Sequence, residues 1–312
     1  MAINNSTKKK VIVVHDMFGT LFSLDAPTAA LRASFPSLSP LRAHAIIMDW
    51  YQCVQRDLAM LTTIGAYQPA SIIFKETLPR ALKQAGLSSS PSASTFTFDP
   101  KDESMYEAQH AQDAQLENPY PSSITQPILD SLQHLTPRPG FVEAFTDIYH
   151  SADNAAITTE LWAATNGGTE LARKLLVAGV GPDAEEYGGE LKEEEDTGGK
   201  RNGVGIFSCD EVQASKPDPR VYAGLRQRLG LPAQASQDQV DATKDSAGAP
   251  SIWFVASHAW DLLAAKKAGF KTCWISYEEF YACPKLFGRP DIVALDLAEG
   301  ARAILEWERS AP

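Results

Sequence analysis

The sequence has little that would cross-link or anchor the chain. It contains only four cysteines in 312 residues, Cys53, Cys209, Cys273 and Cys283, and none forms a CxxC pair or stands near histidines at the spacing of a zinc site. We therefore expect free thiols in a reducing compartment, the cytoplasm, and no disulfide framework. No apolar stretch approaches the roughly 20 residues that span a bilayer. The first ten residues are polar and lack the apolar core of a signal peptide.

Basic residues are also scarce. Lys and Arg number 28 against 39 Asp and Glu, which gives a net charge of -11. An acidic chain repels the phosphates of nucleic acids and anionic lipids, and the only dense basic cluster, Lys8-Lys9-Lys10, directly precedes an apolar run. We therefore expect a small-molecule substrate and neither a nucleic acid nor a membrane as partner. The apolar fraction of 44% and the charged fraction of 21% are typical of a globular chain.

Short apolar runs alternate with helical patterns along much of the chain. The first run, residues 11–14, is unbroken and β-branched, which is typical of a strand buried on both faces of a parallel sheet. Helical patterns separate further predicted strands at 160–165, 204–209, 252–256 and 272–275. This alternation predicts a Rossmann-like α/β core, in which helices flank a parallel sheet and the crossovers are right-handed.

A long helical block lies between the first strand and the others. Apolar residues recur at helical spacing over 26–86, whereas 88–123 is rich in Ser, Pro, Asp and Gln and predicts a long surface loop. We interpret 24–136 as a helical cap domain that is inserted into a core formed by 1–23 and 137–312.

Four segments of the predicted core end in short polar motifs. Ligands of open α/β sheets bind outside the carboxyl ends of the strands, so these side chains should converge on one edge. A single Asp after a strand is usually a turn or cap residue. A carboxylate, hydroxyls, a lysine and a second carboxylate in this order are much harder to obtain by chance. The residues are Asp16, Thr20, Thr165, Asn166, Lys216, Ser257, His258 and Asp261.

This order resembles the haloacid dehalogenase superfamily, and most of all its L-2-haloacid dehalogenase branch. The first motif of that branch, Asp-x-Tyr-Gly-Thr-Leu, reads Asp-Met-Phe-Gly-Thr-Leu at 16–21. Its later motifs read Thr-Asn-Gly at 165–167, Lys-Pro-Asp-Pro-Arg-Val-Tyr at 216–222 and Ala-Ser-His-Ala-Trp-Asp at 256–261. The resemblance extends over the core, whereas the cap is matched only by its helical character.

The resemblance implies a hydrolase that acts on carbon–halide bonds through an aspartyl ester. Asp16 would be the nucleophile, Thr20 would hold its carboxylate, and Lys216 would keep it ionised. Asp261 would pair with Lys216 and orient the water that hydrolyses the ester. Thr165 and Asn166 would donate to a substrate carboxylate or to the oxyanion. Further candidates for substrate contact are Phe18, Ser257, His258, Tyr222 and Trp260.

Phe18 bears on the type of reaction. In phosphatases of the superfamily, the residue two positions after the nucleophile is a second Asp, which protonates the leaving alcohol. Phe18 cannot donate a proton, and a halide leaving group needs none, so this residue favours dehalogenation. The fourth motif offers only Asp261 where phosphatases have an acidic pair for magnesium. We therefore expect neither a metal nor another cofactor.

The cap departs from the family pattern. The dehalogenase branch carries an Arg early in the first long cap helix, where this chain has Met48. Arg42 and Arg56, one or two turns away, are the candidates to bind the substrate carboxylate or the halide. The expected substrate is a small 2-haloacid or a related carboxylic acid.

Other interpretations stay open at this stage. The same carboxylate–lysine–carboxylate set could serve a hydrolase or lyase that acts on a larger carbonyl or carboxylated metabolite. A magnesium-dependent phosphatase and a ligand-binding descendant without activity rank behind it. A homodimer is also left open.

Overall fold

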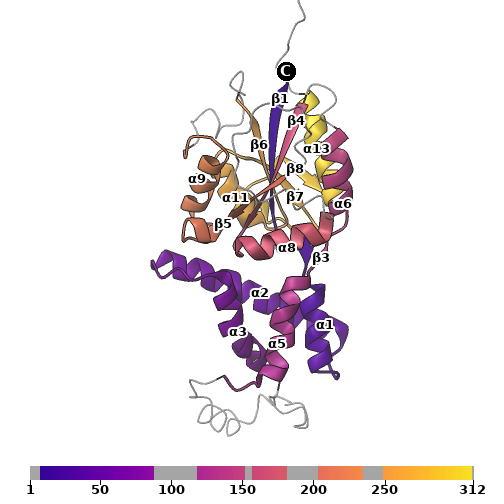
Figure 1. The fold of residues 1–312 in the computed structure, drawn as a ribbon, viewed down its shortest axis with the longest axis vertical. Helices are drawn as coiled ribbons and strands as arrows, with labels where there is room; N and C mark the ends of the chain where they lie inside the picture. Colours follow the sequence, from indigo (N-terminus) through magenta and orange to yellow (C-terminus); the bar gives the residue numbers. More distant parts are fainter. Residues whose placement is uncertain (1–7, 88–117, 152–156, 181–202, 235–248, 311–312) are drawn as a thin grey trace, which may run out of the picture. The chain divides into compact units, whose positions relative to one another are not determined.

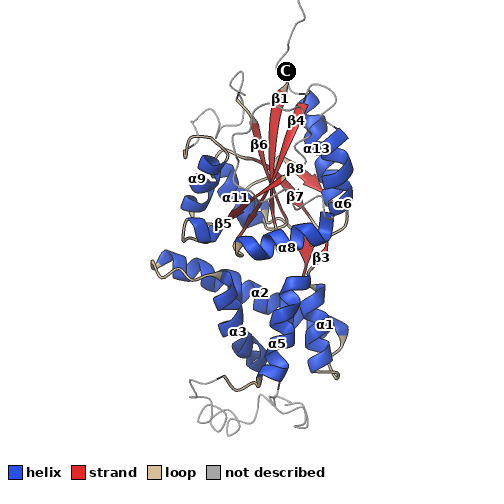
Figure 2. Cartoon of the chain, in the orientation of Figure 1, coloured by secondary structure: helices blue, strands red, loops and turns tan. Residues whose placement is uncertain are grey.

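The computed structural model describes residues 8–87, 118–151, 157–180, 203–234 and 249–310. The chain divides into two compact units, which Figures 1 and 2 show in one orientation. The sheet unit consists of Met1–Ser23, Ala59–Pro69 and Thr136–Pro312, and the helical unit of Leu24–Leu58 and Ala70–Leu135.

The sheet unit is built on six parallel strands. Their order is β5 (Val204–Ser208), β4 (Ile157–Thr165), β1 (Lys9–Asp16), β6 (Ser251–Ala256), β7 (Lys271–Ile275) and β8 (Ile292–Ala294). Every residue of β1 from Val11 to Asp16 is buried, as befits a central strand that is covered on both faces. The parallel α/β core and its five predicted strands are confirmed. The edge strand β8 lies beyond them, because three residues are too few to carry a periodic signal.

Helices cover both faces of this sheet. In Figure 1, α9 (Pro219–Arg228) and α11 (Ala259–Lys267) lie on one side, and α13 (Leu297–Ser310) lies on the other with the helical segment 141–151. That segment comprises α6 (Phe141–Glu143), a π-helical turn (Ala144–Ile148) and α7 (Tyr149–Ser151). The remaining helices are α8 (Thr169–Val180), which contacts β5 and α6, and α12 (Pro284–Phe287), which contacts α11.

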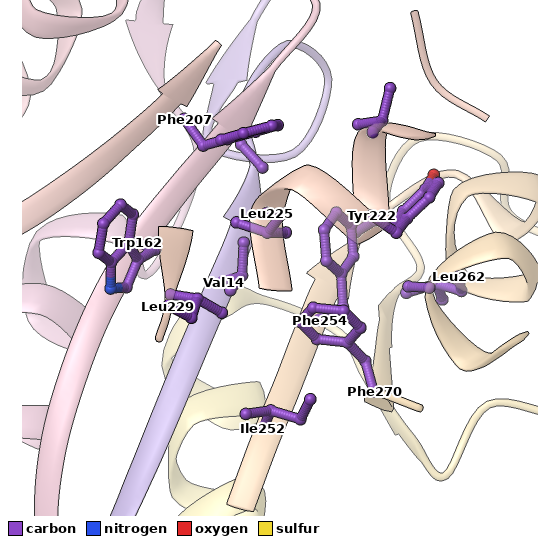
Figure 3. Packing of buried hydrophobic residues seen from close by; sticks show 14 of the residues in the cluster. Val14, Trp162, Phe207, Tyr222, Leu225, Leu229, Ile252, Phe254, Leu262 and Phe270 are labelled. Carbon is purple, nitrogen blue, oxygen red and sulfur yellow. The ribbon is translucent and has the colours of Figure 1, made fainter. Parts of the chain in front are cut away.

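The core between the sheet and the α9–α11 layer is apolar (Figure 3). Alternate strand residues point into it, among them Val14 of β1 and Ile252 and Phe254 of β6. The Phe254 ring meets the rings of Tyr222 and Phe270 edge-on, each with a centroid separation of 5.9 Å. This packing fixes Tyr222 on α9 beside the sheet.

The helical unit contains α1 (Asp25–Ser34), α2 (Pro40–Thr63) as far as Leu58, α3 (Ala70–Gln84), α5 (Ser122–Ser131) and the 3-10 turn Leu132–His134. Buried Trp50 of α2 donates from Nε1 to Thr77 Oγ1 of α3 at 3.0 Å. The helices predicted over 26–86 are confirmed. Most of the predicted loop 88–123 lies outside the described residues. None of the helices in the described ranges is both long enough and apolar enough to cross a membrane.

The two segments of the sheet unit that flank residues 24–135 in the sequence pair with each other. The short strand β2 (Phe22–Ser23) pairs antiparallel with β3 (Thr136–Pro137). The segment Ala59–Pro69 groups with the sheet unit, whereas the sequence-based division assigns all of 24–136 to the cap. The physical reason is that polar side chains of this segment bind the loop at 209–216, which a helical pattern alone does not reveal.

A buried carboxylate ties α13 to the amino-terminal ends of the strands. Glu308 is 2% exposed and accepts hydrogen bonds from Ser251 Oγ (2.6 Å), Trp253 Nε1 (2.7 Å) and Lys271 Nζ (3.0 Å). Its second oxygen lies 2.8 Å from Lys9 Nζ. Burial raises the pKa of the Glu308 carboxyl, but these hydrogen bonds and charges together lower it below its usual value.

We expect Glu308→Gln to lower the free energy of unfolding by about 2–3 kcal/mol at neutral pH, because an amide cannot replace the charge-assisted bonds. The folded-state pKa is the lower one, so the carboxylate stabilises the fold above about pH 4.5 and loses this contribution as the pH falls further. Urea unfolding at pH 7 and at acid pH measures the difference, which should shrink in acid. Glu306→Gln, exposed on the same helix, is the matched control, and equal losses in both variants would contradict the expectation.

Candidate active site

Asp16 ends β1 at the carboxyl edge of the sheet, and a tight turn follows it. Gly19 in this turn has a φ of +82°, a conformation that suits glycine. A Cβ at this position would come within 2.9 Å of His258 Cε1, so glycine also permits the close approach of the imidazole. The turn brings Thr20 back to the strand end, where its Oγ1 donates to Asp16 Oδ2 at 2.8 Å.

Lys216 lies between two carboxylates. Its Nζ donates to Asp16 Oδ1 at 2.6 Å and to Asp261 Oδ2 at 2.9 Å. The side chains of Lys216 and Asp261 are 1% and 0% exposed, and that of Asp16 is 10% exposed. The ammonium group also lies 5.3 Å from the ring centre of Phe254. The predicted convergence of these three charged residues is therefore a feature of the structure.

The three charges set one another's ionisation. Burial alone would raise the pKa of the Asp16 carboxyl, but the charge of Lys216 and the hydrogen bond to His258 lower it well below its usual value. Burial lowers the pKa of Lys216, but the two carboxylates raise it further than burial lowers it. For Asp261, burial and the charge of Asp16 raise the pKa. Asp16 is thus the ionised, partly accessible carboxylate that a nucleophile requires.

A side chain at the end of β4 holds the backbone of the loop that carries Lys216. Asn166 Oδ1 accepts from the Lys216 backbone N–H at 2.9 Å, and Thr165 Oγ1 accepts from Gly167 N at 2.9 Å. After the loop, Asp218 caps α9 by accepting from the backbone N–H of the second helical residue. Thr165 and Asn166 therefore shape the strand end. Their predicted contact with substrate stays a prediction.

Ser257 and Tyr222 form hydrogen bonds with Thr20 and Asp261, respectively. The backbone N–H of Ser257 donates to Thr20 Oγ1 at 2.9 Å, and its Oγ lies 3.0 Å from the same oxygen. The hydroxyl of Tyr222 donates to Asp261 Oδ1. Both residues are almost completely buried, at 0% and 1% exposed. The two residues thus hold Thr20 and Asp261 in place, and their predicted contact with substrate stays a prediction.

His258 lies directly beside Asp16. Its Nδ1 is 3.4 Å from Asp16 Oδ2, and its ring stacks on that of Trp260 with a centroid separation of 5.5 Å. Burial lowers the pKa of His258, but the hydrogen bond and charge of Asp16, with the charges of Glu279 and Glu278, raise it above its usual value. An ionised Asp16 therefore favours the protonated form of the imidazole.

The loop after β7 also contributes to this edge. Tyr277 OH donates to the carbonyl oxygen of Thr20, Glu279 Oε2 accepts from Ala259 N at 2.9 Å at the start of α11, and Glu278 pairs with Arg138. The sequence prediction ends with the strand at 275 and misses these residues. The polar run Ser-Tyr-Glu-Glu directly after that strand is the signal that could have identified them.

Phe18, Arg42 and Arg56 are further residues that the sequence suggests for contact with substrate. Phe18 follows Asp16 by two residues, is partly buried and has no proton to donate. Arg42 donates to the carbonyl oxygen of Ala85 at 3.2 Å and Arg56 to Asp57 Oδ1 at 3.0 Å, both within the helical unit. Their contact with substrate stays a prediction.

In the part of the chain that the structure describes, no group of three or more His, Cys, Asp or Glu side chains is arranged to hold a metal ion. At the sheet edge around Asp16, the carboxylates of Asp16 and Asp261 accept hydrogen bonds from Lys216, Thr20 and Tyr222.

No family model matches the chain. Over 94 residues it is 35% identical to an (S)-2-haloacid dehalogenase of Pseudomonas putida, and the match covers 30% of this chain and 34% of that protein. The chain thus spans about a third of the length of the curated relatives that it matches.

Solved structures resemble the chain over almost its whole length. One, described as a dehalogenase, has a TM-score of 0.61 at 20% identity and covers 97% of both chains. Another is the L-2-haloacid dehalogenase from Xanthobacter autotrophicus with chloropropionic acid covalently bound, with a TM-score of 0.58 at 18% identity over 96% of this chain and 99% of that one. Structural similarity at such low sequence identity establishes the fold alone. In part of its sequence and in its whole fold, the chain is similar to the L-2-haloacid dehalogenases of the haloacid dehalogenase superfamily.

Proposed function

We propose that the protein is a metal-independent hydrolase that removes the halide from a small 2-haloacid or a related carboxylic acid through an ester at Asp16. One observation carries the proposal: the carboxylate that Lys216 keeps ionised is followed two residues later by Phe18, which cannot protonate a leaving group. A halide leaves as a stable anion and needs no proton. The similarity to (S)-2-haloacid dehalogenases supports this interpretation.

In the first step, an oxygen of Asp16 attacks the carbon that bears the halogen. The new carbon–oxygen bond forms as the carbon–halide bond breaks, and the halide departs with the bonding electrons. Lys216 and Thr20 hold the carboxylate in place, so that little reorganisation accompanies the attack. The product of this step is an Asp16 ester.

In the second step, water attacks the ester carbonyl of Asp16. Asp261 is poorly suited to hold this water, because its two oxygens already accept from Lys216 and Tyr222. His258 is better placed. Ester formation removes the Asp16 charge, one of the charges that raise the pKa of His258, and so favours loss of the imidazole proton. The neutral imidazole can then accept a proton from the attacking water. That proton passes to the departing alkoxide, which leaves as a 2-hydroxy acid. The second proton of the water then passes from the Asp16 carboxyl to His258, which restores the carboxylate and the protonated imidazole.

We expect His258→Asn to slow ester hydrolysis by about 10²–10⁴-fold while ester formation changes far less, since an amide can donate to Asp16 but cannot accept the proton. The ester should then accumulate on Asp16, where intact-mass and peptide mass spectrometry detect it. His44→Asn, an exposed histidine of the helical unit, is the control. Turnover at the wild-type rate with no trapped ester would assign the base to another group.

The proposed function is tested by halide release from (S)- and (R)-2-chloropropionate in the presence of a chelator. Release with a preference for one enantiomer supports the proposal. Magnesium-dependent turnover of p-nitrophenyl phosphate would contradict it in favour of a phosphatase. Inactivity on both substrates with a folded protein would favour the larger carbonyl or carboxylated substrate.

We also infer a cytoplasmic location, which the four free cysteines support, two of them buried. The expected partner is the small substrate alone, with no nucleic acid or membrane. A homodimer stays a prediction.

A further inference from the structure

The end of α2 and the turn that follows it bind the loop that carries Lys216. Thr62 is 4% exposed, and its Oγ1 accepts from the backbone N–H of Ser215 at 3.1 Å. The same oxygen lies 3.0 Å from Ser215 Oγ, and Ser215 is 1% exposed. Ser215 immediately precedes Lys216, so these two contacts hold both the backbone and the side chain of the residue next to Lys216.

A second hydroxyl binds the other end of the same loop. Tyr67 OH donates to Asp210 Oδ1 at 2.6 Å, and Asp210 belongs to the short 3-10 turn Cys209–Glu211 that follows β5. We call Ala59–Pro69 the strap, because the hydroxyls of Tyr67 and Thr62 hold the loop 209–216 near its start and near its end.

The loop must be fixed because the ammonium group has two demanding partners. Lys216 Nζ lies 2.6 Å from one carboxylate oxygen and 2.9 Å from another, and a flexible four-carbon side chain keeps both distances only if its backbone is in place. Asn166 holds the Lys216 N–H, and Thr62 holds the preceding N–H. A buried N–H without an acceptor is costly, so the loop would move if the Thr62 hydroxyl were removed.

We propose that Thr62 and Tyr67 are positioning residues, through which the strap fixes the Lys216 ammonium group between Asp16 and Asp261. The inference rests on the proposed function and deepens it, because it assigns part of the catalytic geometry to residues that lie within the inserted region of the sequence.

The first test compares Thr62→Val, which keeps the shape and removes the hydroxyl, with Thr62→Ser, which keeps the hydroxyl. We expect Thr62→Val to lower kcat for halide release by about 10–100-fold with KM changed less than about twofold, since a displacement of about 1 Å is enough for such a loss. The acid limb of the pH profile should move to higher pH, because a displaced Lys216 holds Asp16 ionised less well. Thr62→Ser should restore most of the activity.

Thr63→Val is the matched control, because the Thr63 hydroxyl is exposed and donates to Ala59 O within the helix. A Thr62→Val variant with wild-type kcat and an unchanged acid limb would overturn the inference. Equal losses in Thr62→Val and Thr62→Ser would do the same, since the hydroxyl would then be irrelevant.

A second readout needs no substrate. Amide hydrogen exchange in a peptide over 209–218 should speed up in Thr62→Val at its carboxyl-terminal half, and in Tyr67→Phe at its amino-terminal half, relative to wild type and Thr63→Val. Unchanged exchange in both variants would overturn the inference even if the wild type released no halide. Wild-type inactivity alone would count against the proposed function, not against the strap. Tyr67→Phe supplies the comparison if Thr62→Val does not fold.

Discussion

Asp16→Asn should abolish halide release, with a loss on the order of 10⁴-fold or more, because the amide oxygen is a far weaker nucleophile than the carboxylate. The fold should survive, since Lys216 keeps Asp261 as an ionic partner and the amide can still accept from Thr20. Halide release in a coupled assay measures the loss, and circular dichroism checks the fold.

The intact mass of this variant gives a second result. With substrate present, the wild type or His258→Asn should carry a transient adduct, whereas Asp16→Asn should carry none. Asp49→Asn, an exposed aspartate of the helical unit, serves as the control and should keep full activity. Halide release that survives in Asp16→Asn would remove Asp16 from the chemistry altogether.

Lys216→Met should have the other large effect, on both activity and stability. It removes the ammonium group between the buried carboxylates of Asp16 and Asp261 and leaves His258 as the cation beside Asp16, so proton uptake by these carboxylates becomes more favourable. We expect the free energy of unfolding to fall by about 3–5 kcal/mol, the usual loss when one partner of a buried ion pair is removed. Activity at neutral pH should fall by about 10³-fold or more, because the nucleophile is then protonated and poorly held.

A double variant separates the two effects. Lys216→Met combined with Asp261→Asn removes one of the opposed charges, so it should recover part of the lost stability but none of the activity. Urea unfolding and halide release measure the two outcomes. If Lys216→Met alone were as stable and as active as the wild type, the buried charge cluster would not govern Asp16.

The pH dependence follows from the same cluster. Lys216 and His258 hold the pKa of Asp16 well below its usual value, so the wild type should keep its nucleophile ionised below pH 4. In Lys216→Met the acid limb of kcat/KM should move upward by more than one pH unit. A limb that stays in place would mean that another group controls it.

The central part of the site could be predicted from the sequence because it follows from the fold. Parallel strands that end in Asp16 and Thr165 must present these residues on one edge, and the motif at 216–222 must come near them as it enters α9. The positions of Asp16, Lys216 and Asp261 along the chain were therefore sufficient to predict that these residues lie close together.

Other parts depend on contacts that no local pattern encodes. Helical periodicity identified α2, but nothing in that periodicity says that Thr62 binds a residue more than 150 positions away. Similarly, the sequence does not reveal that Ser257 and Tyr222 are almost completely buried, because the burial of one side chain depends on the packing of several elements. Short elements such as β8 are not predicted from the sequence, because a periodic pattern needs more residues than they contain.

Gly19 constrains which residues can occupy position 258. A Cβ at position 19 would strike the imidazole at 2.9 Å, and the positive φ would strain any larger residue there. The residues at positions 19 and 258 should therefore co-vary among homologous sequences. A sequence with a side chain at position 19 would need a residue smaller than histidine at position 258. Such a sequence would lack the imidazole, which is the group that we assign to deprotonating water.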